Sequence, residues 1–155
     1  MELQFNTEGL EDFITDKGME SDVGVWVRFP GDRRFRIFRA GGSNKAFTRA
    51  FQQAIKPYRR QMDRGTMDPE VSDKVLREVY CRHVIKDWDG IKTIGGEAIP
   101  FAPKTAMAFF ETVPELFNEI VGLAGEAATF AEARLEEAQT VLGNSSTGTT
   151  DTGDS

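Results

Sequence analysis

The segment from Asp87 to Phe117 decides how the helices of this chain are connected, and it reads DWDGIKTIGGEAIPFAPKTAMAFFETVPELF. Glycine and proline interrupt it at short intervals, and neither residue fits the interior of a regular helix. We therefore expect a helix to end at Trp88–Gly90 and an extended arm to follow. New helices should begin at Pro103 and near Pro114, because proline suits the first helical turn, where its missing N–H would have no partner anyway.

Several residues of this segment are predicted to be structural anchors, because each turns the chain or buries an apolar side chain. A large aromatic residue beside a turn fixes the direction in which the chain leaves it, so Trp88 should pack between the helix end and the apolar arm. The predicted anchors are Trp88, Gly90, Ile99, Pro100, Phe101 and Pro114.

Upstream of this segment, the alternation of β-branched and polar residues from Val23 to Phe29 predicts a strand. Pro30-Gly31-Asp32 is a turn signal, and Arg34–Arg39 alternates in the same way. The two runs predict a short β-hairpin, which is the only β unit that we expect.

The rest of the chain has the apolar spacing of helices. One helix is expected from a Ser43 or Asn44 cap to about Tyr58, with a kink or break at Pro57. Asp68-Pro69-Glu70 signals the start of another, whose apolar stripe should extend to Ile85 or Asp87. Helical spacing then continues from Pro103 to Leu142. The predicted fold class is mainly α with a small β component (α+β).

The domain organisation follows from composition. Residues 1–22 form an acidic N-terminal arm that we expect to be loosely docked, and residues 23–142 form a single helical domain with the hairpin at its start. Residues 143–155 are only Gly, Asn, Ser, Thr and Asp. Such a segment cannot bury enough apolar surface to offset its conformational entropy, so we predict a disordered polar tail.

Charge is unevenly distributed along the chain. The stretch from Val25 to Arg64 holds eleven Lys and Arg against two Asp, a local charge of +9, whereas the remainder carries −15. The basic half is compatible with a nucleic acid, an acidic or helical protein partner, or a solvated face balanced by the acidic half. The overall charge of −6 disfavours a polyanion as the partner.

No catalytic, cofactor or metal site is predicted. His83 is the only histidine and Cys81 the only cysteine, so a tetrahedral Cys/His metal set and a conventional catalytic triad both lack members. Asp87 and Asp89 are better explained as residues that cap and turn a helix end than as an acid pair. The glycines before Lys45 lack the full spacing of a phosphate-binding loop.

The N-terminus lacks the features of a secretory signal, and no apolar run approaches the ~20 residues of a membrane span. A single cysteine excludes an intrachain disulfide and suits a reducing compartment. We therefore expect a protein that works in a cytoplasm without a membrane anchor.

The chain combines a tryptophan followed closely by Gly-Ile, an Ile-Pro-Phe arm, a short helix and Pro-Glu-Leu-Phe. In this combination it resembles the tail assembly chaperones of long-tailed, siphovirus-type bacteriophages. The resemblance covers roughly residues 25–130. It implies a non-catalytic protein that binds the tape-measure protein, helps recruit tail-tube subunits, acts in the host cytoplasm and is absent from the mature virion. Homo-oligomers are possible for such a protein.

The residues assigned to partner binding are four basic side chains and three phenylalanines. The basic ones should face an acidic partner, and the phenylalanines should line apolar grooves between helices. They are Arg34, Arg36, Arg39, Arg49, Phe109, Phe110 and Phe117. The competing hypothesis is a small nucleic-acid-binding regulator that uses the basic hairpin and the following helix, with Trp26 and Phe38 stacking on bases.

Overall fold

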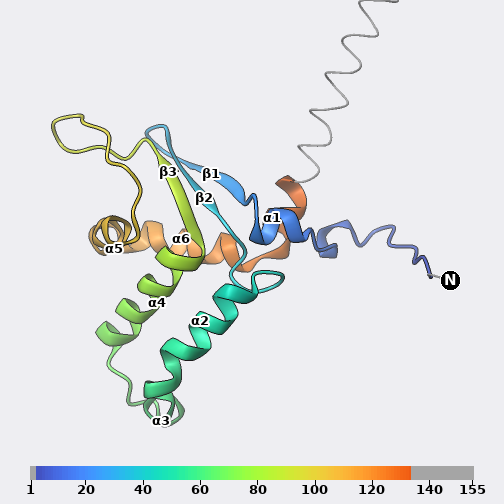
Figure 1. The fold of residues 1–155 in the computed structure, drawn as a ribbon, viewed down its shortest axis with the longest axis horizontal. Coiled ribbons are helices and arrows are strands. Elements are labelled where there is room, and N and C mark those ends of the chain that lie inside the picture. Colours follow the sequence, from blue (N-terminus) through green and yellow to red (C-terminus); the bar gives the residue numbers. More distant parts are fainter. Residues whose placement is uncertain (1–2, 134–155) are drawn as a thin grey trace, which may run out of the picture.

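A computed structural model describes residues 3–133 of the chain. It is mainly helical with a three-stranded antiparallel sheet, which confirms the fold class and the N-terminal hairpin expected from the sequence (Figure 1). The elements are, in order, η1 Glu11–Phe13, α1 Lys17–Ser21, β1 Val25–Phe29, β2 Arg33–Ile37, α2 Lys45–Ile55, η2 Lys56–Tyr58, α3 Arg59–Arg64, α4 Pro69–His83, β3 Ile85–Asp89, α5 Pro103–Thr112 and α6 Pro114–Gly125. Residues 127–133 are also helical, and the polar tail predicted at 143–155 lies outside the described residues.

Strand β2 is the centre of the sheet, whose order is β1-β2-β3. The hairpin pairs Val25 with Ile37 and Phe29 with Arg33, across a tight turn in which Gly31 and Asp32 both have positive φ. Because strand side chains alternate between faces, Phe35 and Ile37 point to one side of the sheet, and both are fully buried.

The third strand differs from the structure that the sequence predicts for this segment. The Asp87–Gly90 stretch was expected to end a helix, and the hairpin was expected to be the only β unit, but α4 ends at His83 and Ile85–Asp89 is a strand paired with β2. A register shift between Arg36 and Ile37 places Lys86 outside the regular pairing. The buried residues Ile85 and Trp88 are therefore three apart, a spacing that is typical of a helix rather than of a strand.

The hydrophobic core lies between the inner face of the sheet and the helices. The ring of Phe35 lies 5.5 Å from that of Phe110 on α5, and Phe110 lies 5.5 Å from Phe117 on α6. Tyr80 of α4 bridges Phe117 and Phe47, with ring centroids 5.6 and 5.2 Å away. These contacts join the sheet, α2, α4, α5 and α6 in one core.

Trp88 joins the sheet to the segment that follows it. Its indole Nε1 donates a hydrogen bond to the Ile99 carbonyl oxygen at 2.7 Å, and its ring meets Phe101 edge to face at 5.3 Å. Between Trp88 and the Ile99–Phe101 arm, Gly90 turns the chain with φ +82°, and a Cβ at Gly90 would overlap the carbonyl oxygen of Asp32. Pro100 is exposed and lies between Ile99 and Phe101, the two arm residues that Trp88 contacts.

The remaining predicted anchor, Pro114, is exposed and begins α6. Its position follows the preference of proline for the first helical turn, where no backbone donor is lost. The helix that it starts buries Phe117 and Ile120 against the core.

A buried asparagine ties the start of α2 to the end of α4. The Oδ1 of Asn44 accepts a hydrogen bond from the N–H of Phe47 at 3.3 Å and so caps α2. Its Nδ2 donates to the carbonyl oxygens of Arg39 and His83 at 2.9 and 2.8 Å. The helices α2 and α4 thus form a helical hairpin with α3 at its tip, which projects from the sheet (Figure 1).

The acidic arm is docked at its C-terminal end, in contrast to the loose arm expected for residues 1–22. Residues 17–21 form α1, and Glu20 is 1% exposed. Its Oε2 accepts from Arg39 Nη1 at 2.9 Å and its Oε1 from the Ser43 N–H at 2.8 Å. Arg39 therefore serves the fold, because it balances a buried carboxylate.

Among the described residues, no helix combines the length and apolarity needed to cross a bilayer.

Replacing Trp88 tests its role as an anchor. Trp88→Ala should lower the free energy of unfolding by about 3–5 kcal/mol, the usual cost of removing a large buried aromatic side chain. Trp88→Phe keeps a ring but leaves the Ile99 carbonyl without its donor, so a loss of about 1–3 kcal/mol is expected. Urea unfolding followed by circular dichroism measures both, and a Trp88→Ala chain as stable as the wild type would contradict this packing.

The two ion pairs on the arginine-rich segment should differ in their contribution to stability. Arg39→Met leaves Glu20 buried without its cation and should cost about 3–5 kcal/mol. The matched control is Arg34→Met, since Arg34 pairs with Asp89 at 3.2 Å on an exposed surface. This control should cost at most about 1 kcal/mol. Thermal unfolding of both variants provides the comparison, and equal losses would refute it.

Candidate functional site

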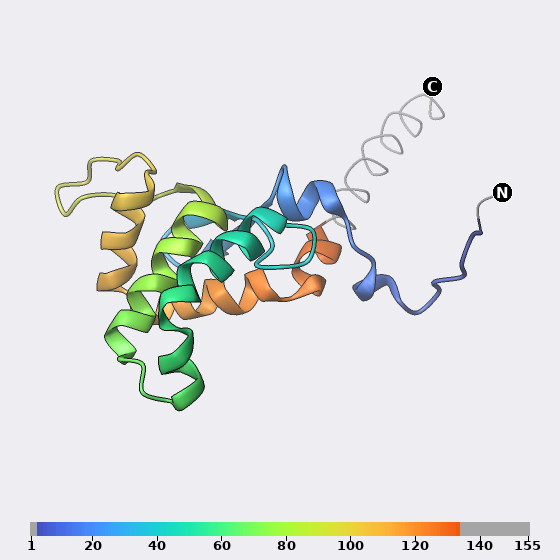
Figure 2. The same ribbon diagram turned by 60° about the horizontal axis from the view of Figure 1, so that its bottom comes forward.

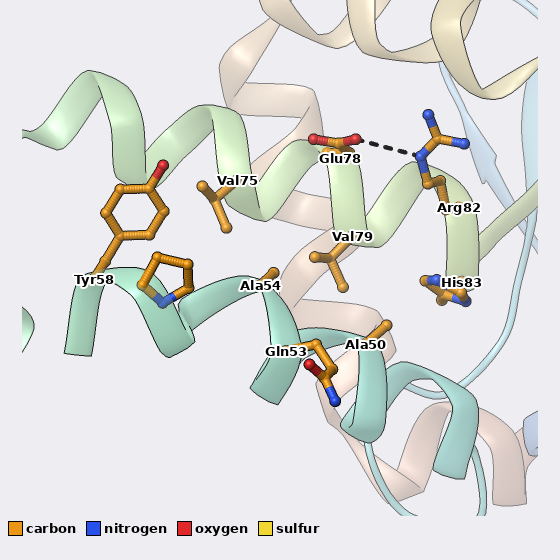
Figure 3. Close-up of a pocket in the computed structure, with 10 residues that line it drawn as sticks. Ala50, Gln53, Ala54, Tyr58, Val75, Glu78, Val79, Arg82 and His83 are labelled. Carbon is orange, nitrogen blue, oxygen red and sulfur yellow. Dashed lines mark ion pairs between the residues drawn. The ribbon is translucent and has the colours of Figure 1, made fainter.

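A surface groove with a volume of about 510 Å³ lies between α2 and α4 (Figure 3). Small side chains form its α2 wall, Ala50 and Ala54, and β-branched side chains form its α4 wall, Val75 and Val79. Ala50 and Ala54 are four residues apart, so they lie one turn above each other on the same side of α2. Their small volume leaves the two helices with an open apolar seam between them.

Polar and aromatic side chains frame this seam. Tyr58, which directly precedes α3, lies at one end, while Arg82 and His83 lie at the other end (Figure 3). Arg82 is paired within its own helix, because its Nε lies 3.5 Å from Glu78 Oε1. The groove is therefore apolar along its length and polar at its rim, which is the form of surface that receives the apolar face of an amphipathic helix.

The α2 side of the groove is strongly basic. Residues 45–62 contain five Lys and Arg and no Asp or Glu, and all five are exposed: Lys45, Arg49, Lys56, Arg59 and Arg60. Arg49 lies one turn before Gln53, which lines the groove, and Lys56 lies one turn after it. The partner that suits this wall has an apolar stripe flanked by acidic residues.

His83 adds no charge to the groove at neutral pH. Burial, with the nearby Lys86 and Arg82 cations, lowers the pKa of His83 below its ordinary value. The imidazole is then uncharged at pH 7, since histidine titrates near pH 6.5 even without a shift. The positive charge beside the groove is thus carried by Arg49 and Lys56, whereas Arg82 and Glu78, which line it, offset each other.

Cys81 is part of the core rather than of a reactive site. It is 1% exposed, and burial raises the pKa of its thiol to about 12. A thiol with such a pKa is almost wholly protonated at pH 7, so it lacks the thiolate that attacks substrates or binds metals. Within residues 3–133, no group of three or more His, Cys, Asp and Glu side chains could hold a metal ion.

The predicted basic residues Arg34 and Arg36 lie on the outer face of the sheet. Arg34 stacks over the Trp26 ring, 4.2 Å from its centroid, and pairs with Asp89. Arg36 donates to the Val23 carbonyl oxygen at 2.8 Å and lies opposite Asp87 in the strand register. Asp87 and Asp89, interpreted above as helix-end residues, therefore face these arginines and offset part of their charge.

The other predicted partner-binding residues fall in four environments. Arg49 is exposed beside the groove, whereas Arg39 is committed to Glu20. Phe110 and Phe117 are 0% and 5% exposed and lie in the core, which corrects the expectation that they line a partner-binding groove. Phe109 is half-buried against Trp88 at 5.6 Å.

Helical spacing in the sequence predicts apolar stripes on α2 and α4, but spacing alone does not distinguish a groove from a packed interface. The signal that distinguishes a groove from a packed interface is the pair of alanines four residues apart opposite valines. Such side chains are too small to fill the space between helices whose separation is set by Phe47 and Tyr80 deeper in the core.

Comparison with known proteins identifies the family. No curated protein matches the chain significantly. No solved structure does so either. A family model described as YdaY prophage protein matches residues 42–143, which include α2, the groove, β3, α5 and α6 and amount to well over half of the chain. The chain therefore belongs to the YdaY prophage protein family.

Proposed function

We propose that this prophage protein is a tail assembly chaperone, which holds an apolar helical segment of the tape-measure protein in the groove between α2 and α4. In this role it keeps the long client from aggregating and helps recruit tail-tube subunits in the host cytoplasm, without entering the mature virion. Two findings support this function: the chain belongs to a prophage family, and its Asp87–Phe117 segment resembles such chaperones.

The observation that carries the proposal is the open apolar seam between two helices, lined by Ala50, Ala54, Val75 and Val79. A helix of a client could place its apolar side chains along this seam, in the manner of helix-in-groove recognition. Binding of this kind depends on buried apolar surface and shape, and it needs no nucleophile or metal. The client would be protected because the stripe that drives its aggregation is covered.

The basic wall of α2 gives the groove selectivity. Arg49 and Lys56 are exposed beside it and would attract client helices whose apolar stripe has acidic neighbours. Charge of this kind mainly increases the association rate and rejects basic helices, while the apolar contacts hold the bound client. The affinity should accordingly fall only partly as salt is raised.

A pair of alanine-to-glutamate variants tests the groove. Ala50→Glu places a carboxylate on the wall of the seam, where a bound apolar helix would bury it. Ala108→Glu is the matched control, because Ala108 is exposed on α5. In coexpression with the tape-measure protein of the same prophage, the wild type and Ala108→Glu should keep the client soluble and copurify with it. Ala50→Glu should weaken binding about tenfold or more, corresponding to the ~1.4 kcal/mol or more lost on burying an unpaired charge.

Circular dichroism must show that both variants are folded, so that a lost interaction reports on the groove. Two results would overturn the proposal. One is a tape-measure protein that stays insoluble with the wild-type chain, and the other is equal capture by Ala50→Glu and the wild type.

The second candidate function is nucleic-acid binding through the outer face of the sheet. Trp26 and Phe38 have cationic neighbours there: Arg34 over Trp26, and Lys86 at 5.4 Å from the centroid of Phe38. An aromatic and basic surface can stack on bases and contact phosphates. Asp87 and Asp89 on β3 oppose this function, because they place carboxylates on the same face.

A mobility-shift assay with DNA and RNA at low and high salt separates the two functions. The chaperone proposal predicts weak binding that the double variant Arg34→Glu, Arg36→Glu changes little. Tight, salt-sensitive binding that this variant abolishes would instead favour a nucleic-acid-binding regulator.

A further inference from the structure

We infer that the groove between α2 and α4 also receives the N-terminal arm, residues 3–14, of a second copy of this chain. The arm would occupy the groove until a client displaces it. This inference rests on the proposed function in using the same groove, and it adds the arm, which that function does not use.

The arm presents apolar side chains that its own body does not cover. Its exposed large residues are Leu3 at 77%, Phe5 at 78%, Leu10 at 50% and Phe13 at 76%. Single exposed apolar residues are ordinary, but four within eleven positions of one segment mark a surface that binds something.

The arm is also independent of the body in its hydrogen bonding. In the described part of the chain, the hydrogen bonds of residues 3–15 all stay within that segment, such as Leu10 N–H to Thr7 O at 2.8 Å and Phe13 N–H to Leu10 O at 2.9 Å. The first tie to the rest of the fold is Asp16, whose Oδ1 accepts from Met19 N–H at 3.1 Å and caps α1. The arm can therefore reach a binding surface without breaking a hydrogen bond to the described part of the body, although Ile14 at its end is half-buried.

The charges of arm and groove are complementary. Residues 3–14 contain three Asp and Glu and no Lys or Arg, whereas residues 45–62, which run along the α2 side of the groove, contain five Lys and Arg and no acid. Apolar residues among acidic ones are the chemistry that the groove is built to accept, because its seam is apolar and its α2 rim is basic. The arm thus resembles the client that we propose for the same site.

The direction of the arm favours a second copy over the chain's own groove. In both views the arm leaves the body at α1 and extends away from it on the side opposite α5 (Figures 1 and 2). The groove belongs to the helical hairpin that projects in another direction (Figure 1). Arm and groove are different surfaces, so the contact between copies is heterologous and each copy keeps one of each.

Two variants remove the two halves of this contact. The first is a chain that begins at Thr15, which lacks the arm but keeps the Asp16 cap of α1. The second is the double reversal Arg49→Glu, Lys56→Glu, at two exposed positions beside the groove. Its control is Lys92→Glu, Lys104→Glu, which makes the same change in net charge at exposed positions outside the groove.

Sedimentation velocity over a range of concentrations should show self-association of the full chain and of the control variant. The chain without its arm and the Arg49→Glu, Lys56→Glu variant should each be monomeric, or associate about tenfold or more weakly. A mixture of these two variants should form a one-to-one dimer and nothing larger, because one partner retains only a functional groove and the other only a functional arm. Higher salt should weaken the contact, since exposed charges are screened within about 10 Å at 0.1 M salt.

Three outcomes would overturn the inference: a full chain that is monomeric throughout, association that survives removal of the arm, and variants that do not combine when mixed. Client capture by the chain that begins at Thr15 separates this result from the proposed function. Capture without self-association would leave the chaperone proposal standing alone. Self-association without capture would leave only the arm contact.

Discussion

Strand β3 pairs with β2 directly after α4 ends, and this pairing determines how the helices are placed. It aligns Trp88 with Phe35 on the buried face, from where Trp88 reaches the Ile99 carbonyl and directs the chain towards α5. Because only Val84 separates α4 from β3, the same pairing fixes the end of α4 against the sheet. The Asn44 side chain then joins that end to the start of α2, so the position of the groove follows from the sheet.

Much of the fold could be predicted from the sequence because its signals are local. Asn44 caps α2, Pro57 lies in the break that ends α2, and Asp68-Pro69 begins α4. Each of these effects depends on neighbouring residues alone. Strand β3 escaped prediction because its identity depends on a distant partner. The bulge opposite Ile37 gives its buried residues a helical spacing, and no local pattern reveals a bulge.

The binding surface was harder to predict for a related reason. The +9 charge of the segment from Val25 to Arg64 is visible in the sequence, but its availability depends on which acids lie beside it. Glu20 neutralises Arg39, and the β3 aspartates face Arg34 and Arg36, whereas Arg49 on α2 and Lys56 at the start of η2 remain exposed. The basic surface that can meet a partner is thereby concentrated on the helical hairpin rather than on the sheet.

The long separation between β2 and β3 has a consequence for synthesis in the cell. The helical hairpin lies wholly between the two strands, so it can form from contacts that are local in the sequence while the sheet is incomplete. Until Asp89 has left the ribosome, β2 has one unpaired edge, and such an edge is a template for pairing with other chains. The nascent chain thus passes through a stage in which its own sheet needs protection, and early formation of the α2–α4 hairpin shortens that stage by bringing β3 close to β2.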